Sequence, residues 1–267
     1  MREDEIQILG KPHHTRKKWW WWVIVAIIFV VAIMMLIIYT ANNSRRQAVL
    51  KQVETDVNPL SVLQSQESGL YEFDTEINDL HIYTLHLVNM ETALTQSTPE
   101  YADTTLLLSL VATKKLPIAG DLVIDGKLMA RGKPMKGFCA IVNGNVAIGE
   151  TSDDDVLNYC IENHGSFFRQ HMLVKDGKIC DTPIKGKAMR CALARQGNDM
   201  YVVFAENEES VHDFAETLID IGVLHAILLD EDLLTFYFKE EVKDMIYEPE
   251  SIADPKEETN YLIFKKR

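Results

Sequence analysis

The fold of this chain is set by three segments between residues 122 and 180: LVIDGKLMA (122–130), CAIVNGNVAIG (139–149) and MLVKDGKIC (172–180). Each places an Asp-Gly or Asn-Gly pair between two short apolar runs, and a fourth turn, QGND at 196–199, separates RCALAR from MYVVFA. Asp, Asn and Gly tolerate the positive φ angles that tight hairpin turns require. The pattern therefore predicts a sheet that is built largely from antiparallel hairpins.

Other segments predict the elements around this sheet. Strands are expected over residues 82–88, 223–230 and 261–264, and the second of these is apolar enough to be buried on both faces. A helix is expected over residues 103–115, from an aspartate cap to lysines in its last turn. Two more helices should follow Ser152 and Ser210, because each serine stands three residues before an aspartate, as in a capping box, and Gly222 should end the second. We expect an α+β domain with two or three packed helices.

Ahead of this domain, residues 19–39 (WWWWVIVAIIFVVAIMMLIIY) form an apolar run without charge, proline or glycine. A helix of this length spans about 31 Å, roughly one hydrocarbon core, and tryptophan suits the lipid–water boundary. Five basic residues precede the run and three follow it closely, which favours a cytoplasmic N-terminus. The run is too long for the core of a signal peptide. We expect a cytoplasmic tail (1–18), a transmembrane helix (19–39), a stalk (40–69) and an exoplasmic, periplasmic domain (70–267).

Composition limits the function of the exported part. From residue 60 onward the chain has 19 basic and 35 acidic residues, which argues against general nucleic-acid binding. No two of its four cysteines have C-x-x-C spacing, which argues against a zinc ribbon or a thioredoxin motif. One or two disulfides are compatible with an exported domain, but Cys139 and Cys191 lie in apolar runs and are expected to be buried. Within the stalk, Ala48, Val49 and Val53 begin an apolar pattern that is too short for a coiled coil.

Residues 163–190 form a basic island in this acidic domain, with six Lys and Arg residues against two aspartates. Guanidinium and ammonium groups that converge can bind phosphate or carboxylate oxygens. Arg169 and Arg190 are flanked by apolar residues that would hold them near the core, so they are the candidates for lining a site. Lys175 and Lys178 stand beside a hairpin turn and are expected to be solvated. His164 is either a proton carrier near neutral pH or an exposed structural residue.

Four strings in the second half of the chain, taken together, resemble the phosphodiester glycosidase family: GSFFRQHMLVKDGK (165–178), IKGKAMRCALAR (184–195), YVVFA (201–205) and SVHDFAETLIDIGVLHAILLD (210–230). The family's Arg-x-Ala-(Ile/Leu)-(Gly/Ala) strand is matched by residues 190–194. Its Leu-Gly-x-x-x-Ala-x-x-Leu-Asp element is matched from Ile221 to Asp230. An earlier element of the family, Pro-x-x-Gly-x-x-(Val)-x-x-Gly-Lys, resembles residues 117–127. The resemblance covers roughly residues 80–240.

The resemblance implies a membrane-anchored hydrolase of glycosyl phosphodiesters or related envelope glycans. Together with the basic island, the resemblance suggests Asp230 and Arg190 as catalytic residues and Arg169, His164 and Lys187 as substrate-binding residues. The family usually continues with Gly-Gly after the aspartate, whereas this chain has Glu231 and Asp232, whose carboxylates would repel an anionic substrate. A catalytically inactive binding or scaffold module of the cell envelope is therefore the alternative. Asp230 and Asp232 could share one strand face, where a pair of carboxylates can bind calcium or act as acid and base in glycoside cleavage. The alternative is a solvated turn, which is the favoured interpretation for Glu231 and Asp232, so no metal or cofactor is assigned. The expected partners are the lipid bilayer, a glycan or sugar-phosphate ligand and a membrane protein.

Overall fold

The computed structural model describes residues 16–58, 68–77, 80–96, 106–110, 120–229, 236–239, 244–247 and 260–267. The chain divides into two compact units, Met1–Gln47 and Ala48–Arg267. Helix α1 (Arg16–Val57) contains the apolar run, whose side chains are exposed. Among the described helices it is the one that is long and apolar enough to cross a membrane.

The second unit contains three sheets, and every strand pairing in them is antiparallel. The largest sheet has the order β1 (Gly69–Ile77), β2 (Leu80–Val88), β13 (Asp199–Ser210), β12 (Lys187–Gln196), β14 (His225–Leu229), β10 (Met172–Lys175), β11 (Lys178–Ile179). A second sheet has the order β16 (Asp244–Tyr247), β15 (Phe236–Lys239), β4 (Leu106–Leu110), β17 (Asn260–Lys266), β3 (Met90–Thr95). The third has the order β6 (Lys127–Ala130), β5 (Leu122–Ile124), β9 (Ser166–Gln170), β7 (Gly137–Val142), β8 (Asn145–Glu150).

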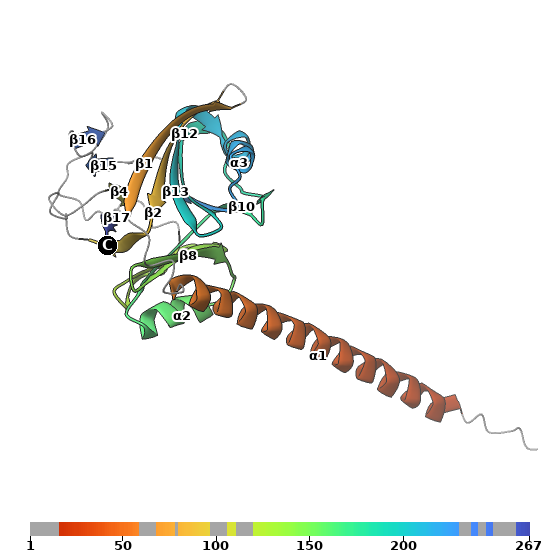
Figure 1. Cartoon of the computed structure of the whole chain (residues 1–267). Coiled ribbons are helices and arrows are strands. Elements are labelled where there is room, and N and C mark those ends of the chain that lie inside the picture. Colours follow the sequence, from red (N-terminus) through yellow and green to blue (C-terminus); the bar gives the residue numbers. More distant parts are fainter. Residues whose placement is uncertain are drawn as a thin grey trace, which may run out of the picture. The chain divides into compact units, whose positions relative to one another are not determined.

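Three apolar clusters explain how these sheets are layered. The main core lies where the sheets face one another and joins Leu193 of β12, Ile148 of β8 and Leu262 of β17. Helix α3 (Val211–Asp220) covers the other face of the largest sheet, and α2 (Asp155–Glu162) covers the other face of the third sheet (Figure 1). The result is the predicted α+β domain, in which the largely antiparallel, hairpin-rich strands form three sheets where one was expected.

The four predicted turns are confirmed, and each joins two paired strands. Asp125, Asn143 and Asp176 have φ angles of 47°, 52° and 51°, and the glycine after each also has a positive φ. At the fourth turn Gly197 has a φ of 61° and Gln196 pairs with Asp199. The predicted strands over 82–88, 223–230 and 261–264 correspond to β2, β14 and β17. Strand β14 lies between β12 and β10 and contributes alternate residues to two apolar clusters, so it is buried on both faces.

The predictions for the helix ends have mixed outcomes. The α3 prediction is confirmed: the Ser210 hydroxyl accepts a hydrogen bond from the N–H of Asp213 at 3.1 Å, and Gly222 has a φ of 90°. The capping box at Ser152 is wrong, because the cap of α2 is Asp154 and no side chain caps it. The N–H of Asp155 instead donates a hydrogen bond to Oδ1 of Asp153 at 3.1 Å.

The predicted helix over residues 103–115 is also wrong. Residues 106–110 form β4, which pairs with β15 on one side and β17 on the other. Strand pairing on both sides outweighed a helix signal that depended on one cap and two lysines. The remainder of that segment, residues 103–105 and 111–115, lies outside the described residues.

The four cysteines are free thiols, and Cys139 and Cys191 are buried as expected. Burial raises the pKa of both thiols well above its ordinary value. Their apolar neighbours therefore keep them protonated and unreactive at neutral pH.

Candidate functional site

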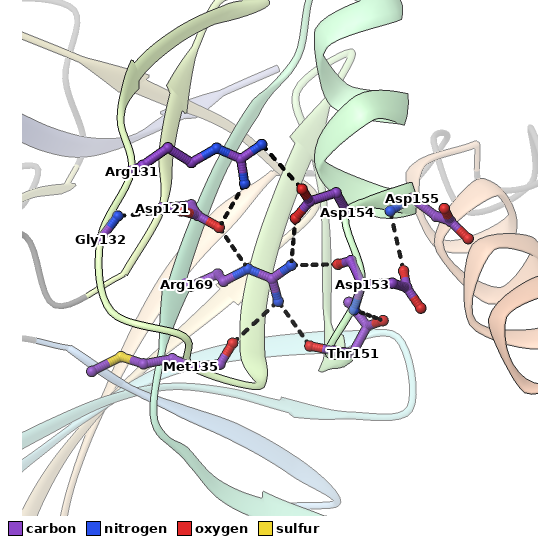
Figure 2. A network of polar contacts seen from close by, with 9 residues as sticks. All are labelled: Asp121, Arg131, Gly132, Met135, Thr151, Asp153, Asp154, Asp155 and Arg169. Atoms are coloured by element: carbon purple, nitrogen blue, oxygen red, sulfur yellow. Dashed lines mark hydrogen bonds and ion pairs between the residues drawn. The ribbon is translucent and has the colours of Figure 1, made fainter. Parts of the chain in front are cut away.

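Arg169 of β9 organises an extensive polar network (Figure 2). Its two predecessors, Phe167 and Phe168, are buried and hold this end of β9 in the sheet, and the Arg169 guanidinium lies 5.3 Å from the Phe167 ring centroid. Arg169 is only 4% exposed. An arginine this deep needs an acceptor for each of its five N–H donors.

All five donors of Arg169 have acceptors in the chain itself. Nε donates to Oδ2 of Asp121 (3.0 Å), Nη1 to the carbonyl oxygens of Met135 (3.2 Å) and Thr151 (2.8 Å), and Nη2 to the Asp153 carbonyl and to Oδ1 of Asp154 (3.5 Å). The guanidinium therefore joins the start of β5, the segment before β7 and the segment between β8 and α2. Its geometry is that of a positioning residue.

Four side chains close this network into a ring of alternating charge. Arg131 contacts Oδ2 of Asp121 at 3.4 Å and Oδ2 of Asp154 at 3.1 Å, and Arg169 contacts both carboxylates from the other side. Arg169 and Asp121 are buried, whereas the side chains of Arg131 and Asp154 are 49% and 47% exposed. The hydrogen bond from Arg131, with the charges of both arginines, lowers the pKa of Asp154, which is therefore ionised at neutral pH. The ring thus has a fixed inner half and an accessible outer half.

Two glycines allow the chain to close tightly around the ring. A Cβ on Gly132 would lie 2.2 Å from the Gly120 carbonyl oxygen, and a Cβ on Gly120 would lie 2.4 Å from Cβ of Arg169. Because Gly132 has no side chain, its N–H can approach Asp121 and donate to Oδ1 at 3.2 Å. No other residue type fits this packing without displacing backbone.

A cavity of about 380 Å³ opens beside the ring. It is lined by three cations, Arg131, Lys136 and Arg169, and by two carboxylates, Asp121 and Asp154. The lining therefore has one excess positive charge in a chain of net charge −13. Exposed cations can bind phosphate oxygens, and carboxylates can accept hydrogen bonds from hydroxyl groups. The arrangement suits a ligand that carries both kinds of group.

Two half-buried histidines give the domain a testable pH dependence. Burial lowers the pKa of His171, with a further contribution from the charge of Lys133, and burial is also the largest cause of the lowered pKa of His225. Between the lowered pKa values of the folded chain and the ordinary value of about 6.5, the unfolded chain therefore binds more protons than the folded chain. The free energy of unfolding is highest above this pH window and falls as the pH decreases through it. We expect the thermal midpoint to fall from pH 7 to pH 5 and the His171→Gln/His225→Gln variant to lose much of this slope. The exposed His212→Gln should keep the slope, and an unchanged slope in the double variant would contradict the assignment.

Arg190 and Lys187, at the start of β12, lie in a different region. Arg190 is 2% exposed and donates to the carbonyl oxygens of Glu209 and Gly186, both at 2.9 Å. The exposed Lys187 contacts the Glu209 carboxylate at 3.7 Å. The structure therefore brings Arg190 and Lys187 together at Glu209, next to a second cavity of about 410 Å³ that Gly186 and Ser210 help to line.

The remaining predicted site residues are not joined to either region by the described contacts. His164 is exposed, has a φ of 52° and follows α2, whereas Arg169 is near the opposite end of β9. Asp230 lies outside the described residues, as do Glu231 and Asp232. In sequence, Asp230 directly follows Leu229, the β14 partner of Cys191, and Arg190 directly precedes Cys191. Among the residues with described positions, no group of three His, Cys, Asp or Glu side chains could hold a metal ion.

Sequence reasoning missed Asp121, Arg131 and Asp154. The hairpin at 122–130 carried only part of the signal for the first two. The Asp-Gly turn pairs Ile124 with Lys127, but a register shift between Leu122 and Val123, which the turn does not predict, pairs Leu122 with Ala130 and so makes Asp121 and Arg131 the next residues on the two strands. Asp154 stood in a run of three aspartates that had been assigned to a capping box.

Comparison with known proteins shows the fold. No protein-family model and no curated protein sequence matches the chain. Among solved structures, the chain is similar to the zebrafish N-acetylglucosamine-1-phosphodiester α-N-acetylglucosaminidase catalytic domain auto-inhibited by its pro-peptide, with 16% identity, a TM-score of 0.54 and coverage of 75% of this chain and 83% of that one. It is also similar to a hypothetical protein from Synechocystis, with 9% identity, a TM-score of 0.56 and coverage of 75% of this chain and 62% of that one. The chain thus spans less than two thirds of the Synechocystis protein. The first likeness supports a distant structural relationship to that catalytic domain.

Proposed function

We propose that this protein is a membrane-anchored binder of glycosyl phosphodiesters, with a cytoplasmic N-terminus and an exoplasmic, periplasmic domain. The observation that carries the proposal is the cavity beside the Arg169 ring, which offers cations and carboxylates side by side on a fold shared with a phosphodiester glycosidase. A glycosyl phosphodiester presents the complementary groups, because it joins a phosphate anion to a sugar rich in hydroxyls.

Each residue of the cavity has a distinct role in this proposal. Arg131 and Lys136, whose side chains reach solvent, contact the phosphate, and Asp154 accepts hydrogen bonds from sugar hydroxyls. Arg169 was expected to touch the ligand. Its five satisfied donors favour an indirect role, in which it fixes Asp121 and Asp154.

We expect the Arg131→Ala/Lys136→Ala variant to bind N-acetylglucosamine-1-phosphate methyl ester at least about tenfold more weakly than the wild type, a loss of about 1.4 kcal/mol. Titration calorimetry measures the affinity of the full chain in detergent. Lys127→Ala, at an exposed lysine of β6, is the matched control and should bind as the wild type does. Equal affinity of the double variant and the wild type would refute this site.

Hydrolysis of the same ligand is the second candidate function, and the glycosidase fold favours it. In that reaction water would add to the anomeric carbon, the bond from that carbon to the phosphate oxygen would break, and a free sugar and a phosphomonoester would leave. Asp230 and Arg190 remain its proposed catalytic residues, with Lys187 and His164 as ligand contacts. Because Arg190 and Lys187 meet at Glu209, this reaction would take place there and not in the cavity beside the Arg169 ring. If the wild type releases phosphomonoester and a correctly folded Asp230→Asn variant does not, the protein is an enzyme. Binding without release would leave a binding module.

A further inference from the structure

The end of the membrane helix is part of the globular unit. Although α1 begins at Arg16, its residues from Ala48 onward belong to the second unit. Val53 and Val57 are buried in one apolar cluster with Phe138 of β7, Leu157 of α2 and Phe167 of β9. The last ten residues of α1 are therefore a packed element of the domain.

Two polar contacts hold this helix end in addition to the valines. Asp56 Oδ2 and Arg195 Nη1 of β12 lie 2.6 Å apart, with both side chains largely buried. Nδ2 of Asn145, in β8, donates to the carbonyl oxygen of Val57 at 2.9 Å and so satisfies one of the acceptors that a helix leaves open at its C-terminus. The helix end is thus attached to strands of two different sheets.

This attachment leaves a short tether. The tether consists of residues 40–47, which are all helical and separate the apolar run from the first residue of the globular unit. The step from Tyr39 to Ala48 corresponds to about 14 Å along a helix and at most about 32 Å even in a fully extended chain. The length of the chain therefore keeps Ala48, where the globular unit begins, within a few nanometres of the end of the apolar run.

The tether is also cationic. Residues 40–53 contain Arg45, Arg46 and Lys51 and no acidic residue, in a chain of net charge −13. Basic residues just outside a transmembrane helix attract anionic lipid headgroups by about 1 kcal/mol each, within a Debye length of the surface. The local charge complements a lipid that carries a phosphodiester.

We propose that the ligand of the domain is a lipid in the same membrane whose headgroup is a glycosyl phosphodiester, with the second ester oxygen attached to the lipid. This inference rests on the proposed function and names its substrate class. The packed helix end keeps the domain near the bilayer, and the three cations concentrate the anionic headgroup there. A water-soluble glycosyl phosphodiester has the same recognised groups but gains nothing from either feature.

The test uses the full chain in phosphatidylcholine vesicles that contain a fluorescent lipid with an N-acetylglucosamine-1-phosphodiester headgroup. Binding to this lipid is compared with binding of the soluble methyl ester. We expect the lipid form to bind at least tenfold more tightly. Arg45→Gln/Arg46→Gln/Lys51→Gln should reduce lipid binding about tenfold or more, and a flexible 30-residue Gly/Ser insertion after Asn43 should also weaken it, because effective concentration falls with linker length. Neither change should alter binding of the methyl ester.

Lys127→Gln/Lys178→Gln is the matched charge control, because both lysines are exposed and lie outside the tether, and it should bind the lipid as the wild type does. Equal affinity for the lipid and the methyl ester, or lipid binding unaffected by both tether changes, would overturn this inference and leave the proposed function standing. Failure of the chain to bind either form would overturn both.

Discussion

A soluble fragment that begins at residue 60 is expected to be several kcal/mol less stable than a fragment that begins at residue 44. The shorter fragment lacks Val53 and Val57, and burial of two valine side chains contributes about 3–6 kcal/mol. It also leaves Arg195 without the carboxylate of Asp56. Since a domain is typically stable by about 5–15 kcal/mol, the shorter fragment should lose a large share of its free energy of unfolding. Circular dichroism during thermal unfolding measures the difference.

A point substitution tests the same contact without truncation. In the longer fragment, Val57→Asp places a charge where the side chain is 0% exposed and should cost about 3–5 kcal/mol. Gln52→Asp, on the exposed side of the same helix, is the matched control and should change stability by less than about 0.5 kcal/mol. If Val57→Asp were no more destabilising than Gln52→Asp, the helix end would not be part of the core.

This helix end shows what the sequence could and could not indicate. The valines at 49, 53 and 57 recur every four residues and lie on one helix face, a pattern that is too short for a coiled coil. Their partner is the face of the third sheet next to α2, and no local pattern identifies a surface that is assembled from residues 123–167. The apolar pattern is therefore visible in the sequence, but the burial of this helix face in the domain was not predicted from it.

The hairpins were predictable for the opposite reason. An Asp-Gly or Asn-Gly turn determines both the conformation and the pairing of its neighbours, so each turn and its two strands follow from a few adjacent residues. Strand β4 was assigned to a helix because its neighbours in the sheet, β15 and β17, come more than 120 residues later in the chain. Local propensity cannot report such a pairing.

Burial of the two candidate arginines was predicted correctly, and their surroundings were not. Arg169 and Arg190 are flanked by apolar residues, and both are almost completely buried. What each guanidinium contacts depends on chain segments that the sequence does not relate to them. The carbonyl acceptors of Arg169, for example, lie 16, 18 and 34 residues away.

Replacement of Arg169 by methionine should destabilise the domain by about 3–5 kcal/mol, because removing one partner of a buried ion pair leaves the other charge uncompensated. Asp121 would keep only the 3.4 Å contact with Arg131 and the N–H of Gly132, and three main-chain carbonyls would lose their donor. Arg131→Met is the matched control, because it removes a half-exposed arginine from the same two carboxylates and should cost about 0–1 kcal/mol. Chemical denaturation of the fragment from residue 44 measures both.

A second substitution separates buried charge from lost packing. If the cost of Arg169→Met arises from the isolated carboxylate, Asp121→Asn in the same chain should recover part of it, since a neutral amide is less costly to bury than an unpaired charge. Asp154→Asn should recover little, because half of that side chain is exposed to water. Equal rescue by the two substitutions, or a smaller loss for Arg169→Met than for Arg131→Met, would show that the ring is not held from its buried side. Arg169 would then be available to contact the ligand directly.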